Sequence, residues 1–202
     1  MYHSRHTPVD LRDFKSEDRY KFLMGTVIPR PIALVTSLND DGVLNAAPFS
    51  QFVVISVEPP LLAFVAHELP MGQKDTVTNV MRSKEYVINT VNETMALQVQ
   101  QCSVSYPSSV SEVAEVGFHT VPSLKVSPQR IAESHVHFEC RLHRAVNFGS
   151  QEEGTIMIVG EVVAAHTAQG VLSGHRVDHQ VMNALGRISG RSYCRTNERI
   201  DV

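Results

Sequence analysis

The chain has 202 residues, 43% of them hydrophobic and 19% charged, which is the composition of an ordinary globular protein. Its net charge of −3 and isoelectric point of about 6.4 exclude the strongly basic character of nucleic-acid-binding proteins. Its apolar runs, roughly ten residues at most, are too short to cross a bilayer, and the polar N-terminus forms no signal segment. We therefore expect one globular domain over residues 1–202, located in the cytoplasm.

The N-terminal half predicts one short helix followed by strands. Residues 1–15 lack periodicity and are expected to form an N-terminal arm. Ser16 is a candidate N-cap for a helix with apolar residues at helical spacing, and Gly25 is expected to end that helix. Strands are expected at 31–37, 43–47, 49–57 and 61–66, with an interruption at Pro48 and turns at 39–42 and 58–60.

The second half mixes helices with longer strands. Asp75 is the expected N-cap of a helix over 75–83, and a further helix should follow Asn92 as far as Gln101. The stretch 103–129 is irregular except for a short helix near 111–116, and such long excursions are often lids or binding loops. Strands are expected at 86–91, 135–142 and 155–164, with a turn at 149–154 and the last strand buried on both faces.

Roughly seven short strands with few helices between them favour a closed or split antiparallel barrel over a doubly wound sheet. No internal repeat or low-complexity linker divides the chain. Nucleotide-binding, metalloprotease and serine-hydrolase motifs are also missing from the sequence. Any cofactor must therefore be held by a less regular arrangement, and no catalytic side chain is predicted.

Four polar residues suggest an anion site. Arg30 lies between two prolines at the start of a buried strand, and Ser50 follows the break at Pro48. Lys74 and Thr76 lie at the start of a predicted helix, where free N–H groups and the helix dipole favour anions. Together these residues could bind a flavin phosphate. The alternative, favoured by the chemistry of the residues alone, is that Lys74 is a solvated surface residue and Ser50 a satisfied strand hydroxyl.

Five segments, in their order and spacing, resemble the flavin reductase-like, FMN-binding split-barrel family, in particular its flavoredoxin-like branch. The resemblance covers most of the chain. It implies a mainly β fold, a six-stranded antiparallel Greek-key split barrel with a few peripheral helices, and a homodimer with the flavin near the subunit interface. The segments are 30–37, 45–50, 74–76 followed by Asn79, 133–140 with 160–162 after it, and 185–187 with Tyr193 and Arg195.

The resemblance also implies which residues hold the cofactor. Ser50, Lys74 and Thr76 would bind the phosphate, and residues 46–52 would border the isoalloxazine ring. The C-terminal appendage 167–202 would pack near this site. Gln51 and Asn183 replace an apolar residue and a proline that are frequent in the family. The implied flavin-binding residues are Arg30, Thr36, Ala46, Ala47, Ser50, Gln51, Lys74, Asp75, Thr76 and Tyr193.

The implied function is an oxidoreductase that uses NAD(P)H as co-substrate and passes electrons through FMN, with FAD as the alternative flavin, to an acceptor that the sequence does not identify. One alternative is an FMN-binding electron carrier that depends on a redox partner protein and has no nicotinamide activity. Another is a barrel without redox function that binds a different ligand, such as haem or a phosphorylated vitamin.

The histidines and cysteines predict no metal site and no nucleophile. On a strand, His137 and Cys140 would face opposite sides, which prevents a shared metal site. His175 and His179 share one helix face and are interpreted as a solvated or interface pair. Cys102 has no charge partner in the sequence and is expected to be inert. The three cysteines, Cys102, Cys140 and Cys194, fit no disulfide framework or zinc ribbon, which supports a reducing compartment.

Overall fold

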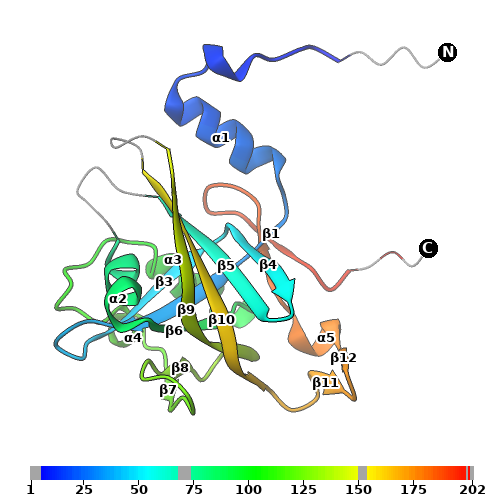
Figure 1. The fold of residues 1–202 in the computed structure, drawn as a ribbon. Helices are drawn as coiled ribbons and strands as arrows, with labels where there is room; N and C mark the ends of the chain where they lie inside the picture. The colour runs from blue at the N-terminus through cyan, green and yellow to red at the C-terminus, as the bar shows by residue number, and fades with distance from the viewer. Residues whose placement is uncertain (1–5, 68–73, 150–153, 199, 201–202) are drawn as a thin grey trace.

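A computed structural model describes residues 6–67, 74–149, 154–198 and 200. Most of the turn expected at 149–154 and the start of the N-terminal arm lie outside the described residues. The fold is mainly β, as predicted (Figure 1). Its main sheet has seven strands in the order β3-β2-β6-β9-β10-β5-β4, all antiparallel, rather than the six expected. These strands are β2 (Ala33–Leu38), β3 (Leu44–Phe49), β4 (Phe52–Val57), β5 (Pro60–His67), β6 (Glu85–Thr90), β9 (Val136–Phe148) and β10 (Thr155–Thr167).

The sheet curls around a core as an open barrel, and its two edge strands are consecutive in the chain. β3 and β4 lie at opposite edges, yet only Ser50 and Gln51 separate them. The edges are not hydrogen-bonded to each other, so the barrel stays open beside this link. The break expected at Pro48 is wrong, because Pro48 lies within β3, where an edge strand tolerates a missing N–H donor.

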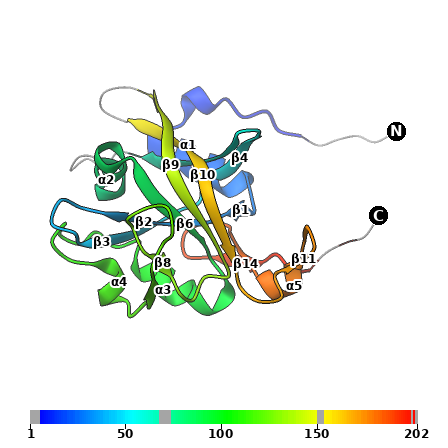
Figure 2. The same ribbon diagram turned by 60° about the horizontal axis from the view of Figure 1, so that its bottom comes forward.

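Two hydrophobic cores lie on the two faces of β2, since successive strand residues point to opposite sides. Val35 contributes to the core inside the barrel, which contains Phe64 and Ile88 and is closed at one end by α2 (Asp75–Ser83). Leu34 contributes to the second core, which η2 (Glu93–Met95), α3 (Ala96–Gln101) and α4 (Glu112–Glu115) cover (Figure 2).

A close contact inside the barrel requires a glycine at residue 160. Gly160 of β10 lies against the fully buried ring of Tyr86 on β6. A Cβ atom at residue 160 would come within 1.9 Å of the Tyr86 hydroxyl oxygen. The aromatic ring therefore occupies the space that any side chain on this residue would need.

Several helix boundaries differ from the prediction by one or two residues. α1 (Ser16–Thr26) starts after Lys15 and continues through Gly25. Lys74, not Asp75, is the N-cap of α2, whereas the Asn92 side chain caps η2 by accepting from the backbone N–H of Thr94, as expected. The remaining elements are η1 (Leu11–Asp13), β1 (Arg30–Pro31), β7 (Thr120–Val121), β8 (Arg130–Ile131), β11 (Leu172–Ser173), β12 (Arg176–Val177), α5 (His179–Met182), β13 (Leu185–Arg187) and β14 (Tyr193–Arg195).

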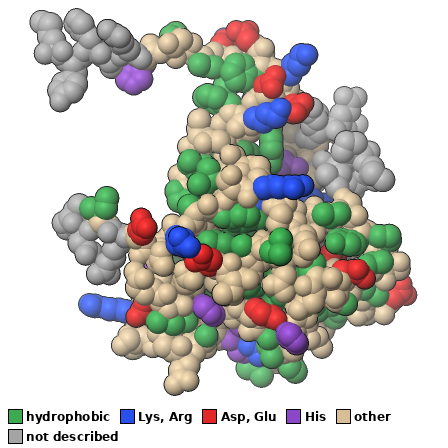
Figure 3. All heavy atoms as spheres, turned by 180° about the vertical axis from the view of Figure 1, so that it is seen from behind, with side chains coloured by type: hydrophobic (Ala, Val, Ile, Leu, Met, Phe, Trp, Pro, Cys, Tyr) green, Lys and Arg blue, Asp and Glu red, His purple; other side chains and the backbone are tan. Residues whose placement is uncertain are grey.

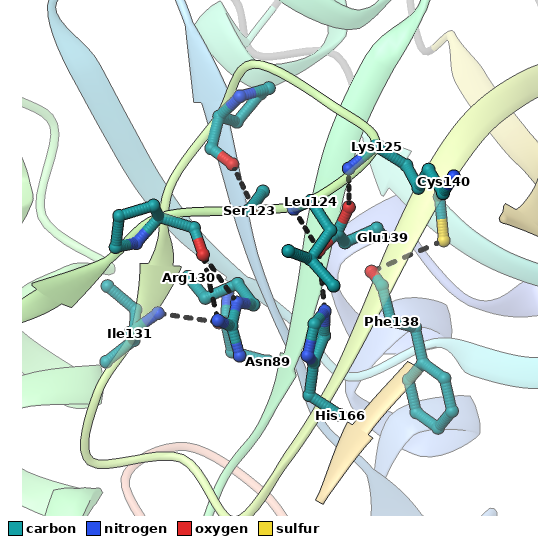
Figure 4. A network of polar contacts seen from close by, with 12 residues as sticks. Asn89, Ser123, Leu124, Lys125, Arg130, Ile131, Phe138, Glu139, Cys140 and His166 are labelled. Carbon is teal, nitrogen blue, oxygen red and sulfur yellow. Dashed lines mark hydrogen bonds and ion pairs between the residues drawn. The ribbon is translucent and has the colours of Figure 1, made fainter. Parts of the chain in front are cut away.

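The long excursion before β9 is anchored on the barrel. Glu139 of β9 is fully buried, and its carboxylate accepts the backbone N–H groups of Leu124 and Lys125 at 2.8 and 2.6 Å (Figure 4). His166 of β10 contacts the same carboxylate at 2.6 Å. These bonds fix this part of the excursion, so it is not a free lid. The strand pattern gave no sign that a loop covers Glu139.

β10 is not buried on both faces as expected. Ile156 and Ile158 point into the barrel core and are buried, whereas Glu161 is exposed and Val162 is only half-buried. The uniformly apolar sequence of this strand therefore does not correspond to complete burial.

Candidate functional site

A cavity of about 560 Å³ lies near the split of the barrel, where segments distant in the sequence meet. α1, β1, the link between β3 and β4, α3, and the segment from β13 to β14 all contribute to its wall. Three of the predicted flavin-binding residues line it together, namely Arg30, Ser50 and Tyr193. Its wall also contains Arg187 and Tyr20, which the sequence did not indicate as site residues.

Arg30 connects this cavity to α1. Its Nη1 donates to the main-chain carbonyls of Met24 and Val27, the latter at 2.9 Å, and its Nε lies 3.4 Å from the Ser50 hydroxyl oxygen. The side chain is held firmly, because Arg30 is only 7% exposed. Burial lowers the pKa of Arg30, and the nearby charge of Arg187 adds to this effect.

Arg187 lies opposite Arg30 because the two short strands β1 and β13 pair with each other. Its guanidinium lies 4.5 Å from the centroid of the Tyr193 ring, a cation–π contact. Gln100 fixes both side chains, since its amide oxygen accepts from Arg187 Nη1 and from the Tyr193 hydroxyl, each at 3.2 Å. Within the described part of the chain, neither Arg30 nor Arg187 forms an ion pair with a carboxylate.

Lys74, Asp75 and Thr76 form a second polar group at the start of α2 rather than part of the cavity wall. Lys74 is half-buried, and its Nζ lies 5.5 Å from the centroid of the Phe49 ring. Burial lowers the pKa of Lys74. Asp75 is half-buried, and the buried hydroxyl of Thr76 donates to Asn45 Oδ1 at 2.9 Å.

Gln51 and His67 form a polar pair next to the cavity residue Tyr20. The amide oxygen of Gln51 contacts the Nε2 atom of His67. On the cavity side, the ring of Tyr20 packs edge-on against His67 with 5.6 Å between centroids. Burial lowers the pKa of His67, and the positive charge of Lys74 lowers it further. These contacts link Gln51 and His67 to Tyr20 of the cavity wall, and the charge of Lys74 acts on His67.

The remaining predicted residues point away from the cavity. Thr36 is fully buried, and its hydroxyl donates to the main-chain oxygen of Gln129 at 2.7 Å. Ala46 is also buried, and its N–H donates to the carboxylate of Glu112. Ala47 is half-buried and packs against the core inside the barrel.

Other candidate chemistry finds no support in the described ranges. They contain no group of three or more His, Cys, Asp or Glu side chains that could hold a metal ion. The three cysteines are free, and burial raises the pKa of Cys102 to about 12, which keeps that thiol protonated. No helix in these ranges is long and apolar enough to span a membrane.

Comparison with known proteins decides the family of the chain. The family model for the flavin reductase like domain matches residues 24–182. The chain belongs to the flavin reductase-like family. The sequence resemblance is thereby confirmed, and solved flavoredoxins share the fold.

Individual known proteins align with nearly the whole chain. The uncharacterized protein YwrF of Bacillus subtilis is 34% identical over 93% of both chains. The structure of nitrilotriacetate monooxygenase component B from Bacillus cereus is 27% identical, with a TM-score of 0.93 and 98% of each chain covered. The 2-nitrobenzoate 2-nitroreductase NbaA of Pseudomonas fluorescens is 32% identical, with a TM-score of 0.88 and coverage of 97% of this chain and 95% of that one.

Proposed function

We propose that this chain binds FMN non-covalently and passes electrons from NAD(P)H through the flavin to a second acceptor. One observation carries the proposal: Arg30, Ser50 and Tyr193, from three distant segments, line one cavity. The family match supports a flavin as the ligand. The three free cysteines are compatible with the reducing cytoplasm that we propose as its location.

The start of α2 suits the phosphate group of FMN. The Lys74 side chain makes no hydrogen bond that caps the helix, so N–H groups of the first turn can donate to an anion. Its ammonium is partly desolvated, and a phosphate would offset the cost of that burial. Lys74 would thus bind the phosphate. Thr76, whose hydroxyl donates to Asn45, would help to position the phosphate.

The cavity suits a flat ring system. Pro48 and Ser50 border it on the side of the barrel split, and the half-buried Tyr193 borders it on the C-terminal side. The buried side chains of Ile32 and Val99 give the wall apolar surface that excludes water from a bound ring. A bound flavin would supply the hydride chemistry, while these residues orient the ring and shield it.

We also propose that the protein is a homodimer. None of the residues of α1 is buried. Its apolar side chains Tyr20 and Leu23 are 52% and 39% exposed. The edge strand β4 exposes Val54 and Val57 at 63% and 84%. Figure 3 shows such hydrophobic side chains on the surface of one face of the molecule. An exposed edge strand with a row of β-branched residues is normally covered, and a second copy would cover it.

Titration with FMN and anaerobic reduction test the proposal in sequence. Purified protein should quench FMN fluorescence saturably, and NADH or NADPH should then bleach the flavin absorbance without oxygen. If FMN does not bind, the proposal is wrong. If FMN binds but only dithionite or a partner protein reduces it, the chain is an electron carrier without nicotinamide activity.

A further inference from the structure

The two arginines of the cavity carry charge that no acidic side chain of the described residues neutralises. Arg30 of β1 and Arg187 of β13 are neighbours on the paired strands, and both line the cavity. We propose that this pair binds the carboxylate of a planar aromatic acid, at a site separate from the one that holds the flavin phosphate. The separation of the two sites rests on the proposed function, whereas the binding of the acid rests on the arginines themselves.

The net charge of the pair fits one carboxylate better than a diphosphate. Arg30 Nη1 donates hydrogen bonds to the carbonyls of Met24 and Val27 at the C-terminal end of α1. That end of a helix carries about half a negative elementary charge, which partly offsets the guanidinium. Arg187 donates to the neutral amide oxygen of Gln100 and to the carbonyl of Gly190, so most of its charge remains. The pair thus keeps a net positive charge, which a monoanion would reduce without placing excess negative charge in the cavity.

The shape of the pair also favours a carboxylate. A guanidinium presents parallel N–H donors that match the two oxygens of a carboxylate, which a lysine cannot do. Arg30 Nη2 has no hydrogen-bond partner among the described residues, and Arg187 is only half-buried, so both can donate to a ligand. Gln100 and the Tyr193 ring already fix the Arg187 side chain, so binding would order few further bonds.

The walls beside the two guanidinium groups favour an aromatic ring. Tyr20 and Met24 of α1 line the cavity, Met24 lies beside Arg30, and neither side chain is among those that we assign to the flavin ring. A small ring with a carboxylate at one end could therefore place its apolar part against these side chains while its charge faces the arginines.

This site lies away from the phosphate site proposed at α2. Lys74 does not line the cavity, whereas both arginines do. FMN has one terminal phosphate, so it can neutralise the Lys74 end or the arginine end, but not both. An FMN molecule held at Lys74 leaves the arginine pair for a second ligand.

Benzoate and its neutral isostere benzamide test the proposal. In calorimetric titrations of FMN-loaded protein, benzoate should bind at least tenfold more tightly than benzamide. Arg187→Gln should remove this preference, leaving benzamide binding and FMN affinity within about twofold of wild type. Arg191→Gln is the matched control, because Arg191 is exposed and does not line the cavity.

Arg187→Lys, which keeps the charge but not the paired donors, should retain only part of the preference for benzoate. It also serves as the second variant if Arg187→Gln fails to fold, which circular dichroism would reveal.

Three results would overturn the inference. Equal affinities for benzoate and benzamide would show that the arginines do not select an anion. An apparent FMN dissociation constant that rises in proportion to benzoate concentration would assign the pair to the flavin phosphate. A raised KM for NADH in Arg187→Gln, with benzoate binding intact, would assign it to a dinucleotide diphosphate. If FMN itself fails to bind, the same titrations of the protein without FMN still test the acid site, so the two failures are distinguishable.

Discussion

Replacing Lys74 with alanine separates ligand binding from folding. Lys74 is half-buried at the uncapped start of α2, and burial lowers the pKa of its ammonium. A charge-assisted hydrogen bond contributes about 1.5–3 kcal/mol. The Lys74→Ala variant should therefore bind FMN about 10- to 160-fold more weakly than wild type.

The stability of the protein without FMN should not fall in this variant. A lowered pKa means that the fold disfavours the charged form of Lys74, so the variant loses an unfavourable term. Its melting temperature without FMN should equal or exceed that of wild type. The affinity of wild type for FMN should also decline as the pH rises through the lowered pKa of Lys74, and the variant should lack that decline.

Quenching of FMN fluorescence measures the affinity, and thermal unfolding followed by circular dichroism measures the stability. Lys84→Asn is the matched control, because Lys84 is the exposed residue at the other end of the same helix. It adopts the left-handed conformation, which asparagine tolerates. An unchanged FMN affinity in Lys74→Ala would remove Lys74 from the site. A parallel loss of affinity and melting temperature would show a structural role instead.

Three further predictions concern the fold, the assembly and the thiol. Glu139→Gln should lower the free energy of unfolding by about 1–3 kcal/mol in urea denaturation at neutral pH, because the loop loses charged acceptors for two backbone N–H groups. Burial raises the pKa of Glu139, but the hydrogen bonds it accepts lower it more, so wild-type stability should fall as the pH drops through this lowered pKa and the variant should lose less. Val54→Lys should shift the mass in light scattering from dimer to monomer, and a wild-type monomer would contradict the assembly that we propose. Cys102 should resist iodoacetamide at neutral pH in the folded protein and react only after unfolding, whereas rapid labelling of the native state would contradict its burial.

The sequence predicted the strands well because their apolar residues follow a clear pattern. Alternation correctly placed Cys140 on the side of β9 that faces the core. The same pattern could not show that the segment around Leu124 covers the polar face, since that segment has no periodicity. The strand interruption expected at Pro48 was wrong for a different reason, because proline breaks a central strand but is tolerated in an edge strand such as β3.

The candidate site was less predictable than the fold. The resemblance brought together Arg30, Ser50 and Tyr193, which line one cavity, and it grouped Lys74 with them although that residue lies at the start of α2. Arg187 was missed because its position depends on the pairing of β13 with β1. These strands have three and two residues, which is too short for any hydrophobic period.

The contact between Gly160 and Tyr86 constrains how this sequence can change over time. Since the phenol ring fills the space above the glycine, neither residue can be replaced by a larger one while its partner stays the same. The two positions should therefore covary among related sequences. Members with a side chain at the position of Gly160 should carry a smaller residue at that of Tyr86, and lineages that keep the tyrosine should keep the glycine.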